Sequence, residues 1–225
     1  MSSKHAFRGV IAIDGPSGSG KSSVTRRLAA DLGAGCLDTG AMYRAATLAV
    51  LRSGVSMADK PTMSKVVETA KLEFGTTPND RYTRLDGNNV DAEIRGDEVT
   101  SHVSVVSSVP QVRKHLIAMQ RQIIADASDG IVVEGRDIGE VVAPDADMKV
   151  YLTADATARA HRRSAQVGAE LEATAKDIER RDTADAQTTR PLDAAPGAIV
   201  VDTTHLDLDQ VLTALHELIA HRETP

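Results

Sequence analysis

The sequence predicts an α/β fold in which a mainly parallel, five-stranded sheet carries helices on both faces. Five short apolar runs support this prediction, because continuous apolar runs are typical of parallel strands buried on both faces. Segments with the apolar spacing of amphipathic helices separate these runs, as in a βα alternation. The chain has 225 residues, 41% hydrophobic and 26% charged, so a core can form without metal or disulfide support.

The predicted elements alternate along the chain. The strands cover residues 8–14, 36–38, 131–134, 148–153 and 199–202. The helices cover residues 21–32, about 40–52, 110–127, 156–163 and 208–219, and a further helix carries residues 180–185. Several helix ends carry sequence signals: Gly33 and Gly54 follow helices, Pro110 begins one and Asp155 can cap another.

Residues 57–100 differ in character from the rest of the chain. A helix is predicted at 61–70, and short strands at 71–74, 81–85 and 90–92, with Asp86-Gly87-Asn88-Asn89 as the turn before the last strand. Local hairpins inside an alternating βα pattern predict an inserted subdomain.

Charge and composition exclude several classes of protein. Lys and Arg number 26 against 32 Asp and Glu, and the chain has no Trp, three Tyr and two Phe. A general nucleic-acid binder needs a basic face or stacking aromatics, so we expect no nucleic-acid partner. Cys36 is the single cysteine, which excludes an internal disulfide or a cysteine zinc cluster. No apolar run approaches the ~18 residues of a membrane span and no signal-peptide layout is visible, so we expect a cytoplasmic protein without a membrane partner.

The strongest motif is a glycine-rich loop between the first strand and the first helix. It fits G-x-x-x-x-G-K-[ST] in the context where that pattern holds phosphate, so we predict a P-loop NTPase-type core. Lys21 would reach the β- and γ-phosphates, and the Ser22 hydroxyl would complete a Mg²⁺ shell. A turn that merely caps the helix is the alternative, but the flanking strand and helix favour nucleotide binding. The residues expected to bind the nucleotide are Gly15, Pro16, Ser17, Gly18, Ser19, Gly20, Lys21, Ser22 and Ser23.

The loop alone leaves open whether the protein is a switch, a motor or a kinase. The chain lacks the N/T-K-x-D segment that a GTP switch uses to read guanine, and its charge disfavours a nucleic-acid motor. A small-molecule kinase needs arginines around its acceptor. The chain has several such candidate arginines. Each could instead be a surface residue, part of a structural ion pair or part of a solvated helix face, but the presence of the glycine-rich loop favours arginines that bind phosphate. The candidates are Arg44, Arg136 with Asp137, the helical group Arg159, Arg162 and Arg163, and the group Arg180, Arg181, Asp182 and Asp185.

Six segments span most of the chain: AIDGPSGSGKSS at 12–23, LDTGAMYR at 37–44, EIRGDEV at 93–99, SSVPQVR at 107–113, EGRDIG at 134–139 and ERRDTAD at 179–185. In this order they resemble the bacterial cytidylate kinase family of the nucleoside monophosphate kinase group. The resemblance implies transfer of the γ-phosphoryl group of Mg–ATP to CMP or dCMP, giving ADP and CDP or dCDP. It implies small-molecule partners, and we expect a monomer. Another small-molecule P-loop kinase, acting on a different monophosphate or on shikimate, and a nucleotide-dependent switch remain the alternatives.

The resemblance also implies roles for individual residues. Cytosine offers an N4 amino donor beside N3 and O2 acceptors, an edge that a carboxylate and a guanidinium complement better than the edge of uracil. Lys21, Arg136, Arg159, Arg162 and Arg163 would stabilise the transferring phosphoryl group. Thr39, Tyr43, Arg44 and Arg136 would bind the acceptor phosphate and its surroundings, Ser104, Arg113 and Asp137 would read cytosine, and Arg181 and Asp185 would contact the ribose.

The resemblance divides the chain into a core at 1–56 and 104–225, a monophosphate-binding insert at 57–103 and a short helical lid at about 159–176. One segment departs from the family pattern. Ala186 stands where a serine is usual, and Thr188 stands where an arginine is expected. Arg190, two residues later, is therefore taken as the acceptor-phosphate residue.

Overall fold

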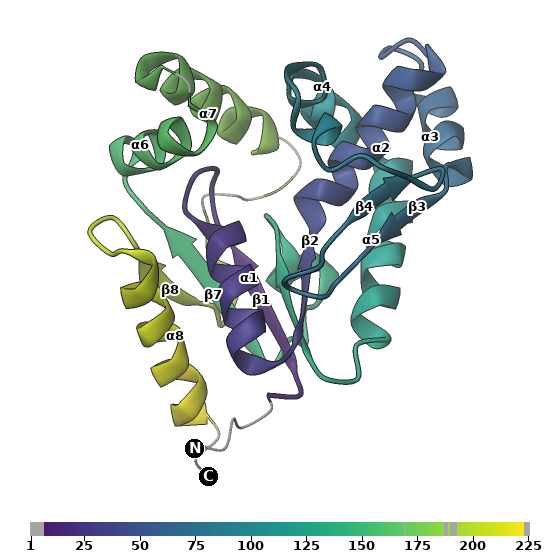
Figure 1. Ribbon diagram of the computed structural model, residues 1–225. Coiled ribbons are helices and arrows are strands. Elements are labelled where there is room, and N and C mark those ends of the chain that lie inside the picture. Colours follow the sequence, from purple (N-terminus) through teal and green to yellow (C-terminus); the bar gives the residue numbers. More distant parts are fainter. Residues whose placement is uncertain (1–6, 169, 187–188, 190–192, 223–225) are drawn as a thin grey trace. The chain divides into compact units, whose positions relative to one another are not determined.

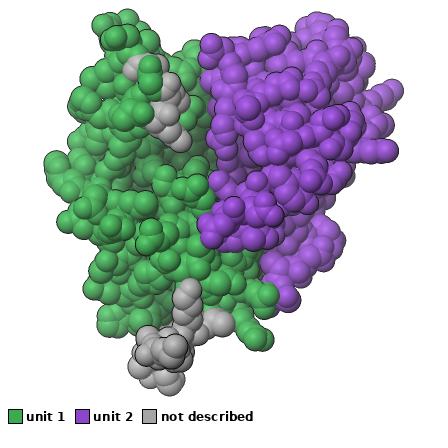
Figure 2. Space-filling view, in the orientation of Figure 1, with its two compact units in different colours: residues 1–36, 129–225 green, residues 37–128 purple. Residues whose placement is uncertain are grey.

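The computed structural model describes residues 7–168, 170–186, 189 and 193–222. The chain divides into two compact units, residues 1–36 with 129–225 (unit 1) and residues 37–128 (unit 2), which Figure 2 colours green and purple. No helix within the described ranges is long and apolar enough to cross a membrane. The proposed core, insert and lid are functional divisions, and they stay a prediction.

Unit 1 contains the nucleotide-loop segment and most of the sheet. Its helices and strands are β1 (Val10–Asp14), α1 (Lys21–Leu32), β6 (Ile131–Glu134), the π-helical turn η2 (Ile138–Val142), β7 (Met148–Thr153), α6 (Ala156–Val167), α7 (Leu171–Asp185), β8 (Ile199–Asp202) and α8 (Leu208–Arg222), and β2 (Gly35–Asp38) begins in it. The predicted order of strands and helices is confirmed, and most bounds agree within three residues.

Within the described residues, five strands form the predicted parallel sheet, in the order β2-β6-β1-β7-β8. The central strand β1 pairs with β6 on one side and β7 on the other, with Ile13 opposite Glu134 and Val150. Parallel strands end at the same edge of a sheet, so Asp14 and Glu134 share an edge with the loop that follows β1.

The core of unit 1 lies between the sheet and the helices α1 and α8. These two helices contact each other on one face of the sheet (Figure 1). The predicted stripe of Val24, Leu28 and Leu32 on α1 is buried. Leu215 and Ile219 of α8 belong to the same cluster. Burying these faces fixes α1, and with it the end of the loop that precedes it.

Unit 2 is built around a central helix. Its elements are α2 (Thr39–Ser53), α3 (Lys60–Thr69), β3 (Leu72–Phe74), β4 (Thr83–Leu85), β5 (Asn88–Asn89), the 3₁₀ turn η1 (Glu93–Arg95), α4 (Asp97–Ser107) and α5 (Pro110–Ala125). Helix α2 has two apolar faces: Ala45 packs in a cluster with Leu85, and Ala46 packs in one with Leu116.

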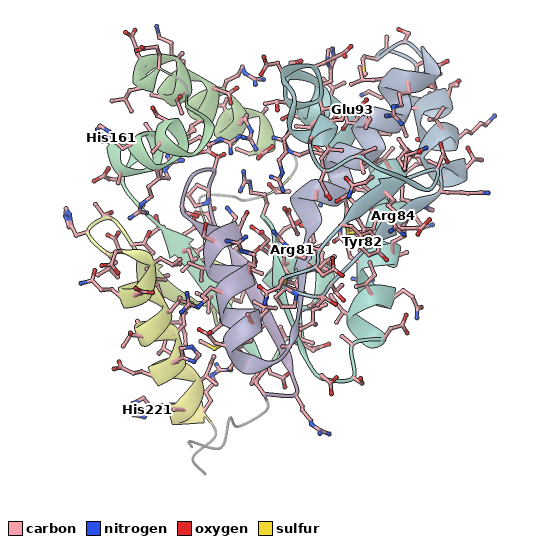
Figure 3. The ribbon with its side chains drawn as sticks, in the orientation of Figure 1. Arg81, Tyr82, Arg84, Glu93, His161 and His221 are labelled. Atoms are coloured by element: carbon pink, nitrogen blue, oxygen red, sulfur yellow. The ribbon has the colours of Figure 1, made fainter. Side chains whose placement is uncertain are left out.

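The predicted strand at 90–92 is wrong. Asp86 and Gly87 alone form the turn, both with positive φ (51° and 80°), so Leu85 pairs directly with Asn88 in β5. Helix α4 is not predicted from the sequence, because its β-branched residues weaken the local helix signal. Packing against α2 stabilises the helix despite this weak propensity. On β4, the Arg84 guanidinium lies 4.3 Å from the centre of the Tyr82 ring (Figure 3).

Candidate nucleotide site

The glycine-rich loop has the backbone that its sequence predicts. Gly15 and Gly18 have φ values of 148° and 79°, and each approaches a neighbouring backbone closely. A Cβ on Gly15 would overlap the Leu152 carbonyl of β7, and a Cβ on Gly18 would lie 2.9 Å from the Arg159 carbonyl oxygen of α6. The loop therefore needs glycine at these positions, for φ and for space.

Lys21, the first residue of α1, is buried within this loop. Its Nζ donates to the Pro16 carbonyl at 2.7 Å. Burial, followed by the nearby Arg136 charge, lowers the pKa of Lys21 to about 7, while Glu134 and Asp14 oppose the shift. An incoming phosphate chain would favour the charged ammonium.

Three consecutive carbonyls of the loop accept from cationic side chains. The Gly15 carbonyl accepts from Arg136 Nη1 at 2.9 Å, and the Ser17 carbonyl accepts from Arg159 Nη1 at 2.9 Å. The Pro16 carbonyl between them accepts from Lys21. The structure thus gathers three of the predicted phosphoryl-stabilising residues at one loop of unit 1.

Two carboxylates of α7 hold these arginines. Asp185 Oδ2 accepts from Arg136 Nε at 3.0 Å. Asp182 Oδ2 pairs with Arg159, and its Oδ1 accepts from the Ser17 backbone N–H at 3.0 Å. Asp185, which the resemblance assigns to the ribose, is therefore an ion-pair partner of Arg136.

Oxygen ligands suited to Mg²⁺ lie beside Lys21. The Ser22 hydroxyl donates to Glu134 Oε2 at 2.9 Å, and Glu134 is buried. A hydroxyl and a carboxylate are hard oxygen donors of the kind that Mg²⁺ prefers, so the residues present fit this ion. Glu134 is not among the site residues predicted from the sequence, although a carboxylate that ends an apolar strand next to the loop was a usable signal.

Asp14, at the end of β1, shapes the neighbouring segment. Its two carboxylate oxygens accept from the backbone N–H groups of Ile138 and Gly139, each at 2.8 Å. Burial raises the pKa of Asp14, and these two hydrogen bonds oppose the shift. Asp14 thereby fixes the start of η2, immediately after Asp137, the predicted cytosine reader.

The arginines of α6 have different partners, although the sequence predicts one clamping face. Arg162 Nη1 donates to Thr203 Oγ1 at 2.8 Å, and Nη2 donates to the carbonyls of Thr203 and Leu206, the latter at 3.1 Å. Arg162 thus holds the loop that follows β8. Arg163 lies near Arg181, whose pKa is lowered first by burial and then by Arg136.

Unit 2 brings other predicted acceptor residues together. The Arg113 guanidinium lies 5.9 Å from the centre of the Tyr43 ring. Arg44 is buried, so its interpretation as a surface residue is wrong, and its Nη1 donates to the Ile94 carbonyl and to Thr100 Oγ1, each at 2.9 Å.

For two further predicted residues the structure gives the helix on which they lie, and a third lies outside the described residues. Thr39 is the buried first residue of α2, and Ser104 lies on α4. Arg190 lies outside the described residues.

Comparison with known proteins identifies the family. The family model described as cytidylate kinase matches residues 11–221. A cytidylate kinase of Nocardia farcinica (strain IFM 10152) is 52% identical over 95% of this chain and 94% of that protein. One from Mycolicibacterium paratuberculosis (strain ATCC BAA-968 / K-10) is 48% identical over 95% of this chain and 96% of that protein.

Among solved structures, a gluconokinase from Sinorhizobium meliloti 1021 is similar in fold, with a TM-score of 0.52, 15% identity and coverage of 97% of this chain and 99% of that chain. At this identity the likeness concerns the fold alone. The family-model match and the sequence relatives show that the chain belongs to the cytidylate kinase family of phosphotransferases.

Proposed function

We propose that this protein transfers the γ-phosphoryl group of ATP to CMP or dCMP, giving ADP and CDP or dCDP. The observation that carries the proposal is the glycine-rich loop with Lys21, Arg136 and Arg159 on its consecutive carbonyls. In a chain of this family, these cations form the charged environment that a donor triphosphate needs. We further propose that the enzyme acts as a cytoplasmic monomer, without nucleic-acid partners.

The nucleophile is a phosphate oxygen of the acceptor. The second pKa of a phosphate monoester is about 6, so the acceptor is largely dianionic at neutral pH and needs no general base. The oxygen attacks the γ-phosphorus, and the bond to the bridging oxygen of ADP breaks in line with it. Lys21 and the arginines then neutralise charge on the transferring group, and their positions supply most of the catalysis.

Ser22 would bind Mg²⁺ together with phosphate oxygens, and Glu134 would lie beside it. When bound, this ion neutralises negative charge on the β- and γ-phosphates. The side chains themselves orient the hydroxyl: Glu134 Oε2 accepts a hydrogen bond from the Ser22 hydroxyl and so fixes the direction of the oxygen lone pairs.

The acceptor residues are taken from the resemblance. Thr39, Tyr43, Arg44, Arg181, Asp185 and Arg190 would bind the acceptor's phosphate and ribose, and Ser104, Arg113 and Asp137 would read its base. The pairing of Arg113 with the Tyr43 ring supports this assignment, since a guanidinium held on an aromatic face is preorganised to donate hydrogen bonds to the acceptor.

An acceptor panel tests the proposal. Initial rates are measured with CMP, dCMP, UMP, AMP and GMP at fixed Mg–ATP, with coupled detection of ADP. CMP or dCMP should be the fastest acceptor, and Lys21→Ala should abolish transfer without unfolding the protein. A different fastest acceptor would identify another monophosphate kinase, and hydrolysis without stimulation by any acceptor would identify a nucleotide-dependent switch.

A further inference from the structure

Asp182 is a buried carboxylate of α7 to which the family resemblance assigns no role. It is 6% exposed. Its Oδ1 accepts from the Ser17 backbone N–H, and its Oδ2 pairs with the Arg159 guanidinium. One side chain therefore holds a backbone donor of the phosphate loop and a cation on that loop at the same time.

Both backbone polar groups of Ser17 have a hydrogen-bond partner. Its N–H donates to Asp182, and its carbonyl accepts from Arg159 Nη1 at 2.9 Å. The backbone of Arg159 also lies against Gly18, where an added Cβ would be 2.9 Å from the Arg159 carbonyl oxygen. Helices α6 and α7 contact each other, so Ser17, Arg159 and Asp182 form a closed set of contacts within unit 1.

These donors are the kind that bind phosphate. Inward-facing backbone N–H groups and guanidinium groups are the usual phosphate donors of such a loop. A carboxylate oxygen and a phosphate oxygen are both anionic acceptors, so each can satisfy the same N–H group. Arg159 also has a donor to offer, because its buried Nε has no hydrogen-bond partner among the described residues.

We propose that Asp182 is a positioning residue whose carboxylate takes the place of a phosphate oxygen at the Ser17 amide. Donor binding then requires Asp182 to give up Ser17 N–H and to share Arg159 with the phosphate chain. The inference rests on the proposed function, since the donor it concerns is the triphosphate of that reaction. As a consequence, the loop binds the donor more weakly than it would if Asp182 did not occupy the Ser17 N–H group and Arg159.

Calorimetry with the imido-bridged analogue of ATP and Mg²⁺ tests this competition. Asp182→Asn removes the negative charge and keeps an oxygen that can accept from Ser17. We expect it to bind the analogue about tenfold more tightly than the unmodified protein, from the loss of one like charge near the phosphates.

Asp177→Asn is the matched control. Asp177 lies on the same helix, is partly exposed and pairs with Arg180, so the variant makes the same change in net charge at a side chain whose ion-pair partner is outside the loop. It should shift the affinity by less than about twofold, because solvent screens this partly exposed charge far more than that of the buried Asp182. Binding by Asp182→Asn that is weaker than, or equal to, that of Asp177→Asn would overturn the proposal.

Hydrogen exchange provides a second measurement. Without nucleotide, the peptide covering Ser17 should exchange faster in Asp182→Ala than in the unmodified protein, because the amide loses its acceptor, and unchanged exchange would also overturn the proposal. Thermal unfolding establishes that each variant is folded. An unmodified protein that binds the analogue but phosphorylates neither CMP nor dCMP would count against the proposed function, while the comparison of Asp182 with Asp177 would still decide this inference.

Discussion

Lys21 is a residue whose protonation depends strongly on its surroundings. Burial is the main cause of a pKa of about 7, against 10.5 for an ordinary lysine. Between these two pH values the unfolded chain holds a proton on Lys21 that the folded chain lacks. This group therefore makes folding stability rise as the pH rises through that window.

Nucleotide binding should reverse this shift in the Lys21 pKa. At pH 8 Lys21 is largely neutral, and a bound triphosphate favours its charged form, so binding of the imido-bridged ATP analogue should take up close to one proton. Calorimetry in two buffers of different ionisation enthalpy measures the uptake. Lys21→Met, which cannot take up a proton, should remove it, and the prediction fails if the variant takes up as much as the unmodified protein.

Asp137 is the residue at which base specificity is expected. Its carboxylate can accept from the N4 amino group of cytosine, whereas uracil presents a carbonyl oxygen there. Asp137→Ala should lower kcat/KM for CMP about ten- to hundredfold, the value of a hydrogen bond to a charged group, and affect UMP less. The exposed Asp145→Ala serves as control, and equal losses with both acceptors would show that Asp137 does another job.

At the scale of elements, the phosphate loop fits closely between β1, β7 and α6. Gly15→Ala would meet the Leu152 carbonyl at a φ that side chains rarely adopt, whereas Gly33 has positive φ but open space around an added Cβ. We expect Gly33→Ala to lower the free energy of unfolding by about 1 kcal/mol and Gly15→Ala by about 3 kcal/mol. Urea unfolding measures both, and equal costs would show that the close approach to Leu152 is unimportant.

The contacts of Arg162 join α6 to the loop after β8. Arg162→Ala leaves the buried Thr203 and the Leu206 carbonyl without this donor, and should lower the free energy of unfolding by about 1–3 kcal/mol. Arg162→Lys, with a single donor group, should recover only part of that loss. A variant of unchanged stability and lowered kcat would instead support the sequence-based role in phosphoryl transfer.

At the scale of the whole molecule, the residues assigned to the donor lie in unit 1, whereas those assigned to the acceptor come from both units, with Arg136, Asp137, Arg181 and Asp185 in unit 1. The glycine-rich loop and its cations belong to unit 1, and Tyr43, Arg44 and Arg113 belong to unit 2. Each unit has its own core, so each can hold its binding residues in place.

Hydrogen exchange should separate the two binding steps. The imido-bridged ATP analogue should slow exchange in unit 1, in peptides covering residues 15–23 and α6, because backbone amides there bind phosphate. CMP should slow it in unit 2, in peptides covering α2 and α5, and GMP should have a smaller effect. Protection of α2 by the analogue alone would contradict this assignment of residues.

Local patterns in the sequence were sufficient for the sheet and the loop. Apolar runs predicted the five strands, and Gly33 and Gly54 end α1 and α2 with the positive φ expected of them. The patterns failed at α4 and β5. In α4 packing overrides weak propensity, and at β5 the conformation of two turn residues sets the register of the hairpin.

The sequence by itself determined the α/β architecture, the nucleotide loop and the family, because periodicity and short motifs encode them locally. Only the tertiary structure decided the partners of the charged residues: Arg159 on Ser17 and Asp182, Arg136 on Asp185, and Arg162 on the loop after β8. Arg159 and Ser17 are 142 positions apart in the sequence, and a local spacing pattern cannot predict a contact over that separation. The lowered pKa of Lys21 has the same origin, since burial and neighbouring charge exist only once the strands and helices have packed.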